Sequence, residues 1–150
     1  MLPARAGGFC IAAAILLSSC SVGQRDSALP LPKAGSSRFV VYRVADSSEG
    51  FVGPFVYVNG FELGKLLKKT CFEASLEAGG YQLKSEGTFY NWAGPPELMQ
   101  LTLEPNTVRY VELVVFPGQA TAVNHVYANR TGEEAKEAIA KIGKCAARQP

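Results

Sequence analysis

Catalytic and metal-binding side chains are scarce in this chain of 150 residues, which has one histidine, two aspartates and 19% charged residues. The formal net charge is +2, and no basic tract stands out. A dedicated nucleic-acid binder carries a basic patch or stripe, so we expect no nucleic-acid partner. Apolar residues make up 47%, which excludes disorder along the whole chain. The length suits one domain with its own core.

The few groups that could perform chemistry do not form a recognisable set. His125 lies in a predicted strand, while Asp26 and Asp46 fall in a predicted tether and an early loop. A catalytic triad needs an oriented carboxylate and a nucleophile, and the sequence has no Gly-x-Ser-x-Gly elbow. A zinc site would require His125, Cys71 and Cys145 to converge with a fourth ligand, and none of them shows metal spacing. We therefore expect no catalytic residues, no metal and no cofactor.

The first 19 residues are typical of an export signal. Phe9 to Leu17 is an unbroken apolar run of nine residues. A helix of that length spans about 14 Å, against the roughly 30 Å core of a bilayer, so the run predicts a signal rather than a membrane span. The sequence Leu17-Ser18-Ser19-Cys20 then resembles the bacterial lipobox, which implies cleavage before Cys20 and acylation of its thiol. The alternative is a plain secretory signal with an incidental cysteine.

Residues 20–37 follow as a lipidated cysteine and a flexible tether, rich in Ser, Gly, Ala and Pro. Two or three acyl chains give stable anchoring, whereas one holds a protein weakly. Ser21, rather than aspartate, follows the cysteine, which in the enterobacterial scheme favours the outer membrane. We expect a lipid-anchored protein of the bacterial envelope, facing the periplasm from the outer membrane.

The cysteine count agrees with an oxidising compartment. Cys10 would leave with the signal and Cys20 would carry lipid, so Cys71 and Cys145 remain as an even pair. A bond between them would stabilise the fold by roughly 4 kcal/mol on the chain-entropy model. Two buried free thiols, or a reactive Cys71, are the alternatives.

Residues 38–150 are predicted to form one all-β domain. Apolar residues alternate with polar ones at period two, and turn signals at Asn59-Gly60, Gly79-Gly80 and Pro105-Asn106 separate the runs. The first two predict hairpins, and the third predicts a turn. Before residue 130 no segment could supply the crossover helices of a parallel α/β fold. We expect an antiparallel β-sandwich of about seven to eight strands. The predicted strands are 38–44, 54–59, 61–66, 71–76, 81–85, 98–103, 107–116 and 122–128.

The C-terminus predicts one helix over 131–147, packed on the sandwich. Thr131 and Glu134 form a capping box, and apolar residues then recur at helical spacing up to Ile142. Cys145, three residues past Ile142, would share the apolar face. A Cys71–Cys145 bond would therefore join this helix to the sheet.

The pattern over Arg38 to Phe116 resembles small bacterial lipoproteins with an uncharacterised PEGA-like β-sandwich domain. The match covers just over half of the chain and implies an envelope sandwich without catalytic residues. It is carried by Phe39 to Arg43, Val56 to Gly60 with Gly64, Leu76 to Tyr81, and Leu101 to Tyr110.

One loop, residues 87–96, gathers Phe89, Tyr90 and Trp92 between Gly and Pro. Aromatic rings in a rigid loop can stack on a sugar or an apolar ligand, although they can equally plug one end of a sandwich. We therefore expect a non-enzymatic envelope lipoprotein that contacts a protein or the cell wall. The alternative is a module that binds a glycan or a small apolar molecule through this loop.

Overall fold

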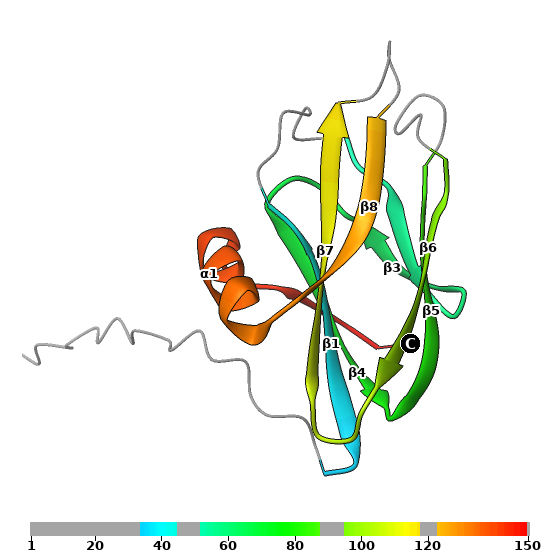
Figure 1. The fold of residues 1–150 in the computed structure, drawn as a ribbon, viewed down its shortest axis with the longest axis vertical. Helices are drawn as coiled ribbons and strands as arrows, with labels where there is room; N and C mark the ends of the chain where they lie inside the picture. Colours follow the sequence, from blue (N-terminus) through cyan, green and yellow to red (C-terminus); the bar gives the residue numbers. More distant parts are fainter. Residues whose placement is uncertain (1–33, 45–51, 88–94, 118–122, 150) are drawn as a thin grey trace, which may run out of the picture.

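The computed structural model describes residues 34–44, 52–87, 95–117 and 123–149. These residues form two facing sheets, and one helix lies outside the first of them (Figure 1). The prediction of an all-β sandwich with one C-terminal helix is confirmed. The strands are β1 (Ser36–Arg43), β2 (Phe55–Val58), β3 (Phe61–Lys65), β4 (Thr70–Glu77), β5 (Gly79–Glu86), β6 (Glu97–Leu103), β7 (Val108–Pro117), β8 (Val123–Arg130) and β9 (Ala146–Arg148), and the helix is α1 (Gly132–Ile142).

The first sheet is mixed rather than purely antiparallel. Its strand order is β8-β7-β1-β4-β9, and the second sheet has the order β3-β2-β5-β6. β1 pairs in parallel with β7, and β4 pairs in parallel with β9. A parallel pair needs a crossover connection, but that connection need not be a helix. Here the chain passes through the second sheet between β1 and β7, so that a parallel pair forms without a helix.

β1 is the central strand of the first sheet and is buried on both faces. Phe39 and Val41 point into the core between the sheets, where residues of both sheets meet. Val40 and Tyr42 point the other way and pack against Ala135 and other residues of α1. A strand that is covered on both faces has a nearly continuous run of apolar residues, which explains the sequence FVVY at positions 39–42.

The three predicted turns have different roles. Asn59 and Gly60, with φ of 47° and 83°, close a true hairpin between β2 and β3. The hairpin predicted at Gly79-Gly80 is wrong, because β4 belongs to the first sheet and β5 to the second. Pro105-Asn106 likewise connects two sheets, from β6 to β7. A turn residue marks a change of direction but does not say which strands pair afterwards.

The helix is shorter than the predicted 131–147. Thr131 caps it as expected, in a capping box with Glu134. It ends at Ile142 because Gly143 has φ of 98° and its N–H bonds to the carbonyl of Ile139 at 2.8 Å. The residues that follow turn back and add β9 to the edge of β4. Cys145 thus lies beyond the helix and not on its apolar face.

Candidate functional site

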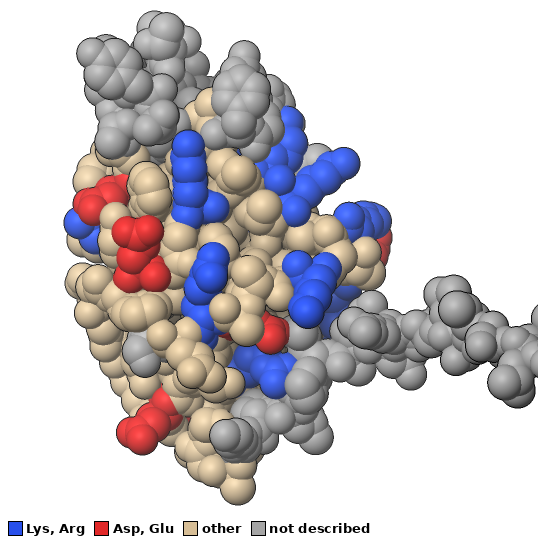
Figure 2. Space-filling view, turned by 180° about the vertical axis from the view of Figure 1, so that it is seen from behind, with Lys and Arg blue, Asp and Glu red and all other residues tan. Residues whose placement is uncertain are grey.

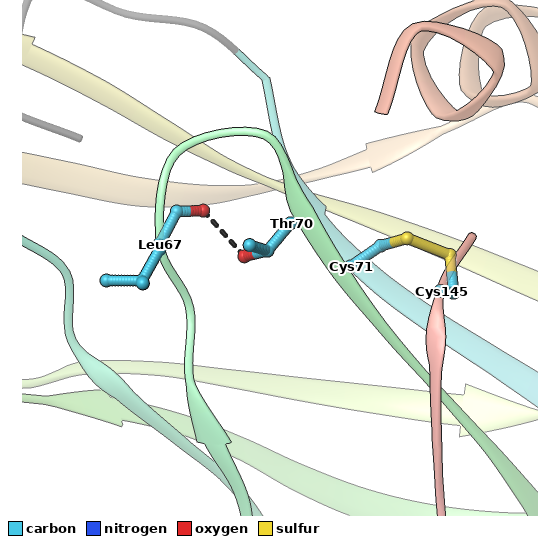
Figure 3. Close-up of a disulfide and its surroundings, with 4 residues drawn as sticks. All are labelled: Leu67, Thr70, Cys71 and Cys145. Carbon is cyan, nitrogen blue, oxygen red and sulfur yellow. Dashed lines mark hydrogen bonds between the residues drawn. A yellow bond between two sulfur atoms is a disulfide. The ribbon is translucent and has the colours of Figure 1, made fainter. Parts of the chain in front are cut away.

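Cys71 and Cys145 are joined by a disulfide between β4 and the segment that leads into β9 (Figure 3). The predicted pairing is present, and both cysteines are buried. At the first residue of β4, the hydroxyl of Thr70 donates a hydrogen bond of 2.6 Å to the carbonyl of Leu67, which closes the turn into the strand. The disulfide therefore ties the segment that follows α1 to the strand that begins at this turn.

Four lysines lie within four residues of the bonded cysteines along the chain, and we call them the lysine corner: Lys68, Lys69, Lys141 and Lys144. Lys68 and Lys69 precede β4, Lys141 is in the last turn of α1, and Lys144 directly precedes the second cysteine. The Cα atoms of the two bonded cysteines are 4.7 Å apart, so that lysines far apart in sequence share one corner. In Figure 2, cationic side chains gather toward the side of the molecule where α1 lies.

An open groove of about 610 Å³ lies beside the lysine corner, between α1 and the segment that carries Lys69. Its Lys141 ammonium donates to the Glu137 carboxylate at 2.8 Å. This contact lowers the pKa of Glu137. The groove therefore joins an apolar strip to charged edges. Its apolar residues are Val44, Ala138 and Ile142, and its charged residues are Lys69, Glu134, Glu137 and Lys141.

A polar network lies under the beginning of α1. Arg130 donates a hydrogen bond of 2.7 Å from Nε to the carboxylate of Glu112. Glu112 is the register partner of Tyr42, whose side chain is buried under the helix. Burial, and then the charge of Glu112, raise the pKa of Tyr42 to about 12. This phenol is neutral at physiological pH, and its ring packs against Ala135 and Ile139 of α1.

Ser85 and His125 form a polar contact between the two sheets. Ser85 Oγ on β5 lies 2.8 Å from His125 Nε2 on β8, a distance that would suit a nucleophile and its base. However, Ser85 is 0% exposed and His125 is 5% exposed. The adjacent Tyr127 has its pKa raised by burial. The contact pairs two buried polar side chains and connects the sheets, and the Ser85 hydroxyl is not accessible to a substrate.

Comparison with known proteins adds no family to this geometry. No protein-family model matches the chain, and no curated protein matches it. Among the described residues, none of the helices has the length and apolar character to cross a bilayer. The same residues contain no cluster of three or more His, Cys, Asp or Glu that could hold a metal. The resemblance to PEGA-like domains stays a prediction.

The other site residues expected from sequence lie outside the described residues, namely Cys20, Phe89, Tyr90 and Trp92. The lysine corner was missed because no basic tract marks it. Its signal was the position of Lys69 and Lys144 next to the two cysteines. Once a disulfide is predicted, those lysines must come together.

Proposed function

We propose that the protein is a lipid-anchored lipoprotein of the bacterial envelope, held at Cys20, whose domain acts as a non-enzymatic interaction module. The Leu17-Ser18-Ser19-Cys20 motif supports the anchor. The observation that carries the proposal is the Cys71–Cys145 disulfide, because such bonds persist in oxidising compartments such as the periplasm. Both the predicted anchor and the disulfide are expected of a protein that is exported from the cytoplasm.

Burial supports a role without catalysis. The Ser85–His125 contact is the arrangement closest to a nucleophile and base within the described ranges, and its serine is fully buried. A substrate would have to separate the two sheets to reach the hydroxyl. The contact is better explained as part of the core.

Exposed apolar side chains support an interaction with a protein or with the cell wall. Phe116 on β7 and Val126 on β8 are each 40% exposed, and Val126 lies opposite Val114 on the outer face of the first sheet. α1 packs farther along the same face, on Tyr110 and its neighbours, so that this apolar area stays open beside it. Apolar area of this kind is favoured at contacts with other molecules.

The anchor is tested by the intact mass of protein extracted from membranes, with and without reductant. We expect a chain that begins at Cys20, carries two or three acyl chains, and gains two hydrogens on reduction. Cys20→Ala should abolish acylation, while Cys10→Ala, within the predicted signal, should leave the mass of the mature protein unchanged. An unacylated wild-type chain would refute the proposal.

A second candidate is ligand binding by the 87–96 loop. In its favour, β5 ends at Glu86 and β6 begins at Glu97, so that the loop joins two paired strands. Trp92→Ala should then abolish binding to purified cell-wall glycan without changing the midpoint of thermal unfolding. Equal binding by wild type and variant would remove this candidate.

A further inference from the structure

We propose that the lysine corner and its groove bind the phosphate headgroups of anionic lipids, in the membrane that holds the anchor. The inference rests on the proposed lipid anchor, because the anchor places a bilayer within reach of the domain. It adds to that function a second contact with the same membrane.

The first support is the way in which the fold concentrates charge. Lys69 and Lys141 border one groove, and the disulfide places Lys144 close to Lys69. Lys141 already pairs with Glu137, and a cation at the end of a helix also offsets the helix dipole. That structural explanation does not extend to Lys69, which belongs to a different segment and forms no ion pair with any described residue.

The second support is the backbone at Lys69. Its φ is 56°, in the left-handed region that favours glycine or asparagine. The Lys69 side chain is exposed, so its packing does not offset the free energy that this backbone conformation costs a non-glycine residue. A lysine at this turn position is better explained by its charge than by the stability of the turn.

The third support is the apolar strip inside the groove. Val44, Ala138 and Ile142 line the groove beside Lys69 and Lys141. The two carboxylates of the groove are already engaged, because Glu137 accepts from Lys141 and Glu134 accepts from Thr131. A phospholipid offers a phosphate for the ammonium groups and glycerol and acyl carbons for the apolar strip. A fully polar polyanion would gain nothing from these three residues, so the groove favours a lipid.

The tether supports simultaneous contact of anchor and domain. Thirteen residues, 21–33, separate Cys20 from the first described residue. A chain of thirteen residues can reach at most about 45 Å. The disulfide lies at the far end of β1, because Tyr42 pairs with Cys71 whereas Ser36 pairs with Glu77, and eight strand residues span roughly 26 Å. The reach of the chain exceeds this length, so the lysine corner can face the bilayer while Cys20 stays inserted.

The test uses the chain from residue 20 with Cys20→Ser, which keeps every described residue and removes the lipid. Sedimentation with vesicles should show binding to phosphatidylglycerol vesicles and not to pure phosphatidylcholine, and the binding should weaken as salt is raised. Each lysine near an anionic surface is worth roughly a fivefold change in affinity, so Lys69→Gln with Lys144→Gln should lose about 25-fold. Lys84→Gln, on β5 of the second sheet, is the matched control and should bind as the parent does.

Lys69→Gly separates charge from folding. Glycine suits a φ of 56°, so the variant should unfold at the same temperature as the parent, or a higher one, and still lose about fivefold in vesicle affinity. Lys69→Arg should keep the affinity.

Three results would overturn the inference. They are unchanged binding by Lys69→Gly, equal binding to both kinds of vesicle, and affinity for soluble polyglutamate that equals the affinity for phosphatidylglycerol vesicles. The last result would indicate an acidic polymer or protein as the partner. The vesicle experiment uses a chain without lipid, so a failure to bind vesicles would not contradict the acylation of Cys20. Conversely, an intact mass without acyl chains would refute the anchor but not the binding of the domain to vesicles.

Discussion

Removing the disulfide should take away a large part of the stability of the domain. The bonded cysteines are 74 residues apart. On the chain-entropy model, opening a loop of that size lowers the free energy of unfolding by about 4.5 kcal/mol. Domains of this size unfold with free energies of roughly 5 to 15 kcal/mol. The variant Cys71→Ala with Cys145→Ala should therefore be marginally stable or unfolded.

Urea denaturation followed by circular dichroism measures this loss. The double variant and the reduced wild-type protein should give the same transition, because both lack only the cross-link. Hydrogen exchange should also accelerate first at Ala146–Arg148, since this short edge strand pairs only with β4 and its residues are exposed.

Two results would refute this reasoning. A loss below about 1 kcal/mol would mean that the unfolded chain already holds the two cysteines close together. Full protection of β9 in the reduced protein would mean that its three-residue pairing with β4 holds without the bond.

Three further predictions concern other contacts. Ser85→Ala should lower the free energy of unfolding in urea by about 1 to 2 kcal/mol, because it removes a hydrogen-bond partner from the buried His125. Folding raises the pKa of Tyr42 from 10.0 to about 12, so its contribution to stability is complete below pH 10 and is lost as the pH rises toward 12; urea midpoints of Tyr42→Phe should lack that step. Thr131→Ala should cost about 1 kcal/mol in thermal unfolding by removing the cap that bonds to Glu134.

Local chemistry made much of the fold predictable from sequence. The alternation of apolar residues located the strands, Asn59-Gly60 located a hairpin, and Thr131 located the start of the helix. Strand pairing was harder to predict, because each residue of β1 meets a residue of β7 that lies 70 positions later in the sequence. The predicted helix ran past Gly143, because Ile142 and Cys145 are spaced as on one helical face, whereas Gly143 ends α1.

The candidate site was harder to predict, because its residues become neighbours only through long-range contacts. Lys69 follows Lys68 directly, but Lys144 lies 75 residues further along the chain with no adjacent cation. Ser85 and His125 lie on different sheets, so their contact depends on how the sheets stack. Composition shows that such residues exist, whereas only the topology shows which of them meet.

The disulfide connects the stability of the domain to the proposed lipid contact. It holds Lys144 beside the turn that carries Lys69, and β9 continues directly from the second cysteine. In a reducing compartment the segment after Gly143 would lose this attachment, and the lysines would no longer be held at one corner. The complete cationic surface is then expected only after export, on the side of the membrane where Cys20 would be acylated. Oxidation, anchoring and headgroup binding would thus occur in one compartment, so that the domain does not present its complete membrane-binding surface before it is exported.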